Sequence, residues 1–366
     1  MHNVMSLKTI CLLFVFVTSL SFSQESMHLE EIAPEVEGKQ DVKTEIKEYI
    51  NHHLLDSYDF SLTSYTTDSG EHKYIGFPLP VILWDNGLKV FSSSKFHHGE
   101  SVAEVDGNHY ALHHNKIYKT DAAGTITLDE HHHATNKKPL DFSITKNVFT
   151  IFLVGLLMFF MFSGMAKKYK KGNMPKGIGR FLEPIILYIR DDIALPNIGK
   201  KHYKRYMPYL LTVFFFVWII NLLGLTPLGV NVTNNIAVTL ALALITYVLT
   251  TFTANKNYWG HIFWMPGVPV PMKIILAPIE LLGTIIKPFS LMIRLYANIT
   301  AGHIVLMSII GLMFIFKNWL GSSLSFGLAF ALSLLELLVA ALQAYIFTML
   351  SALYFGSAVE EHHDDH

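Results

Sequence analysis

The feature that most restricts how this chain can fold is a run of fifty residues, 206–255, that contains no Lys, Arg, Asp, Glu or His. At 1.5 Å per residue, the run is long enough to cross a bilayer twice. The break between the two crossings falls at Gly224-Leu225-Thr226-Pro227-Leu228-Gly229. Three further stretches carry few charges or none: 148–166, 274–316 and 318–359. The sequence therefore predicts a multi-pass membrane protein.

The composition agrees with this prediction. Of the 366 residues, 51% are hydrophobic and only 16% are charged, and the charges are clustered. This is a membrane composition rather than that of a large soluble core. The formal net charge is −1, so the charge balance does not favour nucleic acid as a partner.

The last two apolar stretches are too long for one perpendicular crossing. As straight helices they measure about 65 and 63 Å, roughly twice the thickness of the hydrocarbon layer. Each is therefore two short spans or one long, tilted helix. Glu280, Lys287 and Arg294 recur every seven residues on one side of a helix, which favours a single helix. We expect an all-α membrane domain over 141–366. Its five or so helices are expected at 144–166, 206–226, 234–254, 273–316 and 321–356.

The N-terminus resembles a secretory signal peptide. Lys8 precedes a short apolar core at 9–20, and small residues follow before Gln24, so we expect a signal peptide at 1–23. An uncleaved anchor is the alternative. Cleavage would remove Cys11, the only cysteine, and leave an exported region without disulfides.

Residues 24–140 are polar and His-rich, and we expect them to form an exported region. We expect helical character at 40–55 and short strands between about 72 and 128. Turns are predicted at Asp85-Asn86-Gly87, Asp106-Gly107-Asn108 and Ala123-Gly124. Consecutive histidines do not converge on one ion as spaced ligands do. We therefore predict no metal and no other cofactor, with a weak surface metal site as the alternative at His131, His132 and His133.

A strongly basic segment follows the first membrane helix and predicts the orientation. Its charges are Lys167, Lys168, Lys170, Lys171, Lys176, Arg180, Lys200, Lys201, Lys204 and Arg205. Short loops this basic face the cytoplasm. We expect the N-terminal region in the periplasm and the C-terminus in the cytoplasm of a bacterial inner membrane. Residues 181–193 between the basic clusters suit an amphipathic helix on the membrane surface.

Ionisable side chains inside membrane spans are expensive and are functional candidates. The last two stretches contain five, namely Glu280, Lys287, Arg294, His303 and Glu336. Arginine keeps its proton, so Arg294 cannot relay protons, but it can attract a carboxylate and block a proton leak. The alternative is a structural Arg294 that pairs with Glu336 or snorkels.

His303 and Glu336 can both accept and release protons. Glu336, Gln343 and Tyr354 line one face of the final helix. His303 lies nine residues after Arg294, half a turn around the helix, so the two faces suit two aqueous paths. A buried, packed histidine is the alternative for His303. Glu280 suits the mouth of an inner path, and the role of Lys287 stays open.

Two motifs resemble a known family. Ser290 to Asn298, followed by Ala301-Gly302, resembles the essential-arginine motif of the ATP synthase subunit a family, and Leu342 to Phe347 resembles its last-helix motif. The resemblance covers most of 141–356 and a patch near 45–60. It implies a bacterial F-type subunit in the Fo sector that conducts protons beside a ring of c subunits, with subunit b as a stator partner, and that is not itself catalytic.

The resemblance also implies roles for individual residues. Arg294 would separate two half-channels. Four residues fall at outer half-channel positions: Asn298, His303, Glu336 and Gln343. Three fall toward the inner half-channel: Glu280, Ser290 and Tyr354. Familiar relatives have the acid and the histidine of the outer pair in the opposite order, which suggests that His303 and Glu336 act together. Residues 62–138 look like an insertion about which the family says nothing.

Two other functional classes remain as alternatives. A free-standing secondary transporter would tend to show paired internal repeats with broken helices, whereas here the intramembrane charges sit only in the last third. A membrane-anchored metal-binding protein would explain the histidines but not Arg294, His303 or Glu336. Copurification with a c ring and a soluble ATPase separates these alternatives.

Overall fold

The computed structural model describes most of the chain after residue 55. The described ranges are 56–66, 72–99, 101–130, 134–170, 172, 177–226, 230, 232–265, 268–315 and 319–360. They all belong to one compact unit, Ile46–His366. The expected signal peptide at 1–23, the expected helix at 40–55 and the histidines at 131–133 lie outside the described residues.

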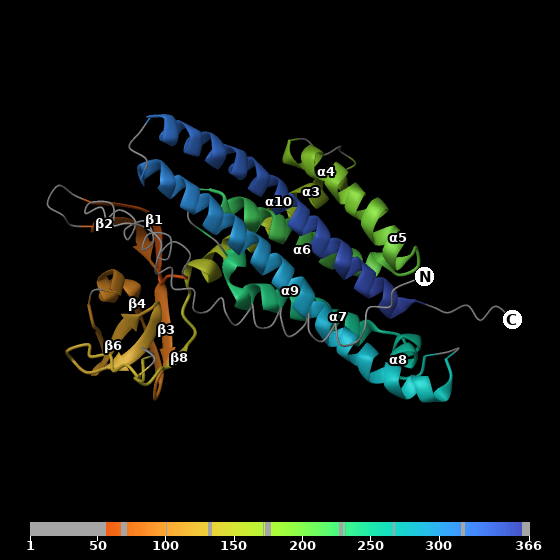
Figure 1. The fold of residues 1–366 in the computed structure, drawn as a ribbon, viewed down its shortest axis with the longest axis horizontal. Helices are drawn as coiled ribbons and strands as arrows, with labels where there is room; N and C mark the ends of the chain where they lie inside the picture. The colour runs from red at the N-terminus through yellow and green to blue at the C-terminus, as the bar shows by residue number, and fades with distance from the viewer. Residues whose placement is uncertain are drawn as a thin grey trace. The chain divides into compact units, whose positions relative to one another are not determined.

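The region before the first membrane helix is built from short antiparallel strands, as predicted, although they begin at residue 59 rather than 72 (Figure 1). The pair β1–β2 joins Asp59–Thr66 to His72–Pro78. A second sheet has the order β4-β3-β8, from Leu88–Ser92, Pro80–Trp84 and Leu140–Asp141. A third has the order β5-β6-β7, from Ala103–Val105, Asn108–His113 and Lys116–Thr120. The short 3-10 helix η2 spans Ser93–Gly99.

The predicted turns explain why these strands pair as they do. Asp106 and Gly107 connect β5 to β6 with φ of 48° and 73°, and two consecutive positive φ values match the twist of a two-residue hairpin. Asn86 and Gly87, with φ of 53° and 133°, turn β3 into β4. The alternating inward residues of these strands close a small core around Tyr110 and Phe96.

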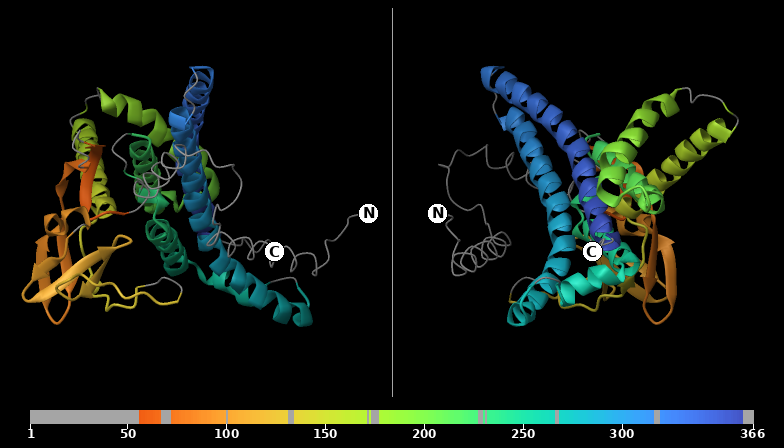
Figure 2. Two further views of the ribbon diagram at one scale, coloured as in Figure 1. Left: turned by 60° about the vertical axis from the view of Figure 1, so that its left-hand side comes forward. Right: turned by 90° about the vertical axis from the view of Figure 1, so that its right-hand side faces the viewer.

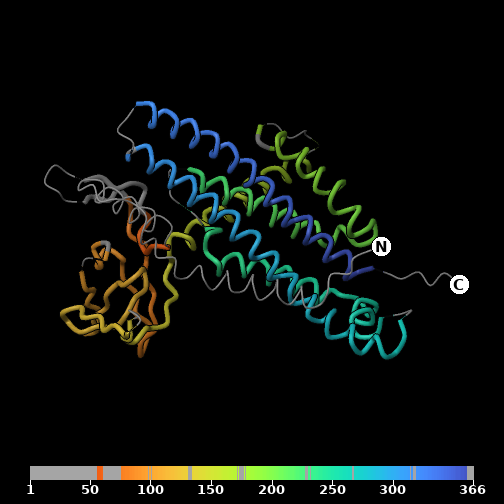
Figure 3. The backbone as a smooth tube through the Cα atoms, in the orientation of Figure 1, coloured from red at the N-terminus to blue at the C-terminus, as the bar shows by residue number. Residues whose placement is uncertain are grey.

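Within the described residues, five helices are long and apolar enough to cross a membrane, which agrees with the predicted number. They are α3 (Lys146–Lys170), α6 (Tyr203–Gly224), α7 (Ile236–Thr253), α9 (Val270–Ile315) and α10 (Trp319–Val359). The helix α9 is continuous over 46 residues, as the spacing of Glu280, Lys287 and Arg294 predicted, and α10 is continuous over 41 residues. Figure 2 shows both as long, curved helices that lie side by side, and Figure 3 traces the chain through them.

A helical segment connects α3 to α6 and carries the predicted amphipathic region 181–193. It consists of α4 (Ile178–Tyr188), the π-helix η3 (Ile189–Ala194) and α5 (Leu195–Ile198). Ile189, Ile193 and Ala194 are fully buried because η3 packs against α6 and α10. A Cβ atom at Gly356 would collide with the Asn197 carbonyl, so α5 approaches α10 where only glycine fits. The segment is therefore packed into the helical core along one side.

Two short elements complete the membrane portion. The 3-10 turn η4 (Val232–Asn234) precedes α7, and α8 (Lys256–Phe263) precedes α9. Asn235 caps α7 by accepting a hydrogen bond from the Ala237 N–H at 3.0 Å. Thr300 on α9 donates a hydrogen bond to the Asn234 side chain. These bonds tie one end of α7 to the middle of α9.

The first turn of α3 packs into the strand region. The Lys146 N–H donates to the Ser57 carbonyl at 2.9 Å, and the Asn147 N–H donates to Asp56 Oδ1 at 3.1 Å. Burial raises the pKa of the Asp56 carboxyl. The Phe149 ring lies edge-on to the rings of Phe60 and Phe77, at 5.4 Å from each. The strand region and the start of α3 therefore share one packed contact.

Candidate functional site

A cavity of about 270 Å³ lies between α6, α9 and α10. It brings together all four residues that were predicted to serve the outer path. The polar lining residues are Asn221, Asn298, His303, Glu336 and Gln343. A polar cavity of this size can hold several water molecules. Two residues from α9 and two from α10 thus meet Asn221 of α6, which was not among the predicted site residues.

The two long helices hold Glu336 by a close approach. A Cβ atom at Gly302 would lie 2.9 Å from Glu336 Oε1, so the carboxylate occupies the space that a side chain at Gly302 would fill. Glu336 Oε2 is buried and has no hydrogen-bond partner among the described residues. A buried carboxylate oxygen requires a partner. The geometry therefore leaves Glu336 Oε2 able to carry a proton or to bind a water molecule in the cavity.

His303 is buried in the same cavity and lies one residue from Gly302. Its half-turn offset from Arg294 directs it to the covered side of α9, whereas Ser290 and Asn298 are exposed. Asn298 nevertheless lines the cavity with His303, because the cavity extends around that side of the helix. A packed histidine thus accounts for the burial of His303 but not for the polar side chains around it.

Asn221 was not predicted as a site residue. It is 6% exposed and accepts a hydrogen bond from Thr233 at 3.0 Å through its Oδ1. Its Nδ2 has no partner within the described part of the chain, and the residue lines the cavity. An amide in the middle of an apolar helix is a costly group and was the available signal. Only the packing shows that it faces the residues of α9 and α10.

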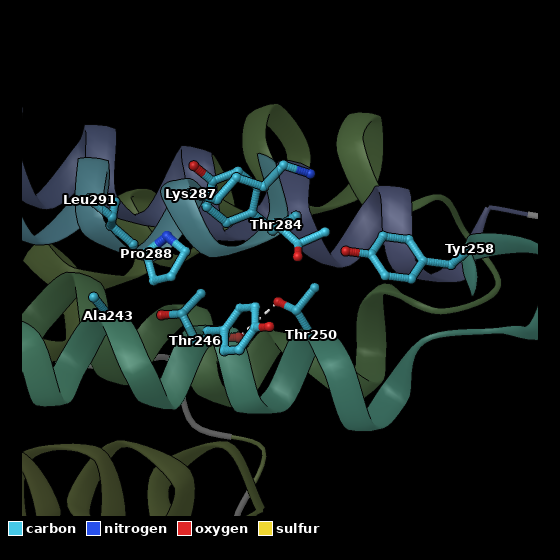
Figure 4. Close-up of a pocket in the computed structure, with 10 residues that line it drawn as sticks. Ala243, Thr246, Thr250, Tyr258, Thr284, Lys287, Pro288 and Leu291 are labelled. Atoms are coloured by element: carbon cyan, nitrogen blue, oxygen red, sulfur yellow. Dashed lines mark hydrogen bonds between the residues drawn. The ribbon is translucent and has the colours of Figure 1, made fainter. Parts of the chain in front are cut away.

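A second, much smaller pocket of about 10 Å³ lies between α7, α8, α9 and α10. Figure 4 shows Lys287 on one side of it, with Thr246 and Thr250 across the gap and Tyr258 at one end. Tyr354 also lines it, and Lys287 Nζ lies 5.6 Å from the centre of that ring. This is a cation–π distance. Lys287, to which the sequence assigned no role, therefore lies against Tyr354, a residue predicted for the inner half-channel.

The other two residues predicted for the inner path lie outside the lining of this pocket. Ser290 is exposed, and Glu280 is half-buried nearer the start of α9. Burial raises the pKa of the Tyr258 hydroxyl, and the nearby charges of Tyr247 and Glu280 raise it further. Glu280 therefore does not line the pocket, although its charge is one of the factors that raise the pKa of Tyr258 at one end of it.

Arg294 lines neither pocket and lies between them. The contacts Lys287–Tyr354 and Gly302–Glu336 fix the antiparallel register of α9 against α10. Arg294 follows Lys287 by seven residues and precedes Gly302 by eight, so it is about 10 Å from one contact and about 12 Å from the other along the helix. Its side chain is half-buried. A permanent positive charge thus lies between the two polar regions along α9.

The described residues offer no cluster of three His, Cys, Asp or Glu side chains that could hold a metal ion. His131, His132 and His133 fall outside this search. The histidines that are described in the strand region include His113 and His114, whose rings stack edge-on at 4.2 Å.

Two protein-family models match separate parts of the chain. A model described as ATP synthase A chain matches residues 148–356, and another, described as a domain of unknown function, matches residues 49–142. The second match nearly coincides with the insertion predicted at 62–138. The strand region is therefore similar to a recurring domain.

Curated relatives agree with the first match. The chain is 42% identical over 232 residues to "ATP synthase subunit a" of Chloroherpeton thalassium, covering 62% of this chain and 69% of that protein. It is 42% identical over 233 residues to the protein of that name from Myxococcus xanthus, covering 62% and 77%. It is 40% identical over 277 residues to the one from Pelodictyon phaeoclathratiforme, covering 74% and 80%.

Proposed function

The chain belongs to the ATP synthase A chain family, and on that premise we propose that its two polar pockets belong to two proton half-channels that Arg294 keeps apart. As a family member it is the proton-conducting stator subunit in the membrane sector of an F-type ATP synthase, not a catalytic subunit. The observation that carries the proposal is the position of Arg294 between the pockets. A proton that passed directly from one to the other would meet a fixed positive charge.

The larger cavity is the outer half-channel in this proposal. Glu336 and His303 exchange protons with water in the cavity, because a carboxyl group and an imidazole can each gain and lose a proton. The amides of Asn298, Gln343 and Asn221 orient that water. The burial of Glu336 against Gly302 supports this assignment, since the carboxylate meets the cavity rather than lipid.

The smaller pocket belongs to the inner half-channel. Tyr354 lines it, and Lys287 sets a positive charge beside the phenol. Glu280 and Ser290 lie on α9 on either side of Lys287 and extend the polar route along the helix. The positive charge of Lys287 favours anions and opposes the accumulation of protons. Protons would therefore pass through this pocket and leave it rather than stay bound there.

The partner ring of c subunits would lie against the exposed face of α9 near Arg294. Ile286, Phe289 and Ile293 form an exposed apolar row there, and each is at least half exposed. A ring carboxylate that passes Arg294 would lose its proton to one half-channel and regain one from the other. Subunit b would be a further stator partner. The basic loop supports an inside location for the loops after α3 and for the C-terminus.

Replacement of the separating charge tests the proposal. Arg294→Ala should abolish proton-driven ATP synthesis in inverted membrane vesicles while the complex still assembles, and it should raise passive proton leakage. Arg180→Ala is the matched control, because Arg180 is an exposed arginine on α4 and should leave synthesis unchanged. Coupled synthesis at the normal rate in an assembled Arg294→Ala complex would refute the assignment.

A further inference from the structure

The central strand β3 of the sheet β4-β3-β8 carries apolar side chains on both faces, but the strand region covers only one of them. Val81, Leu83 and Phe91 point to the inner face and are buried. The opposite face, here called the outer sheet face, consists of Ile82, Trp84, Leu88, Val90, Leu140 and Phe142. Apart from Ile82, these side chains are between 53% and 65% exposed. Such a double-sided apolar strand is typical of a sheet that is covered on both sides.

The strand register aligns these side chains into one continuous patch. Trp84 lies directly opposite Leu88 on one neighbour and Leu140 on the other. Ile82 lies opposite Val90, and its carbonyl accepts a hydrogen bond from the Phe142 N–H at 2.9 Å. The outward positions of the three strands carry no charged residue. A contiguous exposed apolar patch of this kind marks a binding surface.

This patch is attached directly to a membrane-spanning helix. Backbone pairing along β8 continues to Ile144, whose N–H donates to the Pro80 carbonyl at 3.1 Å, and α3 begins two residues later. Phe142 precedes α3 by four residues, which is at most about 14 Å of extended chain. The packing of Phe149 on Phe60 and Phe77 restricts rotation at this junction. The sheet therefore cannot move far from the bilayer surface.

We propose that the outer sheet face binds the lipid bilayer at the surface through which α3 enters it, with Trp84 and Phe142 in the layer between headgroups and acyl chains. Aromatic side chains are enriched at that depth, and apolar side chains with no charge among them are favoured there. Phe152 and Leu153, in the second turn of α3, are also exposed. The strand region would then anchor α3 at a fixed height in the membrane.

Quenching of a site-specific fluorophore by lipid tests this proposal. In a Cys11→Ser background, Leu140→Cys is labelled with a small fluorophore in the intact complex, which is reconstituted into phosphatidylcholine vesicles. Part of the lipid carries a nitroxide near the headgroup end of its acyl chain. The label should lose about half its fluorescence to this lipid and little to aqueous iodide, because interfacial side chains lie roughly 5–10 Å below the headgroup boundary. Ala122→Cys, in an exposed turn, is the control and should respond only to iodide.

A second label on the other edge strand protects the test against a local folding defect. Leu88→Cys should be quenched by the nitroxide lipid as Leu140→Cys is, because both side chains flank Trp84 on the same face. Quenching of both labels by iodide to the extent of the Ala122 label would show a water-facing surface and overturn the proposal. Protection of both labels from lipid and iodide would show that protein covers the face, which would overturn it equally.

Discussion

At the scale of single residues, three ionisable groups share two helices but have different surroundings. Arg294 is half-buried between the two pockets, His303 is buried, and Glu336 sits against the backbone of α9 at Gly302. Polar groups in a low-dielectric site are sensitive to the loss of a neighbour, because the remaining charge has no alternative solvation. Substitutions at these positions should therefore have large effects on proton flow and small effects on assembly.

The pair His303 and Glu336 should be partly exchangeable. His303→Ala and Glu336→Ala should each slow proton pumping roughly tenfold or more, as expected for the loss of a proton-transfer group. The double variant His303→Glu with Glu336→His should recover part of the rate, because it restores the order of familiar relatives while keeping both groups in one cavity. Pumping is measured in inverted vesicles with assembly checked. A double variant no better than the worse single variant would return His303 to the role of a packed histidine.

Gly302 should matter because of the space it leaves. In Gly302→Ala, the added Cβ would lie 2.9 Å from Glu336 Oε1, so the carboxylate must move away from the helix. Proton pumping should fall several-fold although alanine is the better helix former by about 1 kcal/mol. Gly283→Ala on the same helix is the control, since its Cβ would meet no described atom within 4 Å. Equal pumping in the two variants would contradict this account of Glu336.

At the scale of elements, the helices and sheets are stabilised in different ways. The long helices satisfy their own backbone groups and pack through side chains such as Tyr206 and Phe355, whose rings stack at 4.5 Å. The strand region has a small core and relies on a buried ion cluster as well. Asp85, with a side chain only 1% exposed, contacts Lys119 at 2.7 Å and Lys137 at 3.1 Å. That cluster closes the turn after β3 against β7.

The Asp85 cluster predicts an acid sensitivity of the strand region. The hydrogen bond from Lys119, with further help from Lys137, lowers the pKa of Asp85 to about 2. An unperturbed aspartate titrates near pH 4, so this stabilisation is complete above about pH 4 and disappears as the pH falls through about 2, a loss on the order of 2 kcal/mol. Resistance of the strand region to pepsin should drop over that interval.

Two variants distinguish the contribution of the Asp85 cluster from the general effect of acid on the stability of the strand region. Asp85→Asn should make pepsin resistance lower at pH 4 and remove its dependence on pH below that point. Asp106→Asn removes the exposed pair with Lys89 and should change little, because surface ion pairs contribute weakly. A wild-type profile that stays flat between pH 4 and pH 2 would rule out the proposed contribution of Asp85.

At the scale of the whole molecule, orientation decides which pocket opens to which side. If each of the five long apolar helices of the described chain crosses the membrane once, the strand region and the end of α10 lie on opposite sides. The basic residues after α3 predict that this loop is cytoplasmic. If so, the end of α9 and the start of α10 lie outside, and the start of α9 with Glu280 lies inside. This arrangement is consistent with the larger cavity as the outer half-channel.

Reporter fusions test the orientation directly. A reporter near residue 170 should be active in the cytoplasm, and one near residue 120 should be active in the periplasm. The reason is that short basic loops are retained on the cytoplasmic side. Fusions truncated after α3 and full-length insertions should agree. The opposite result at either position would reverse the assignment of the two half-channels.

The sequence by itself determined the five apolar helices of the described chain, the continuity of α9, and the hairpin turns at Asn86 and Asp106. These features follow from local rules, namely the length of apolar runs, the spacing of charges on a helix and the positive φ of turn residues. Each can be recognised without knowing what packs against it.

Only the tertiary structure decided which residues meet. Gly302 faces Glu336, Asn221 reaches the cavity of His303, and Lys287 lies over Tyr354, because α6, α9 and α10 pack in one register. A helical sequence specifies its faces but not the rotation and offset of its neighbours, which depend on the sum of many small contacts between them. The strand register likewise placed Trp84, Leu140 and Phe142 on one exposed face, since residues far apart in sequence become neighbours only when strands pair.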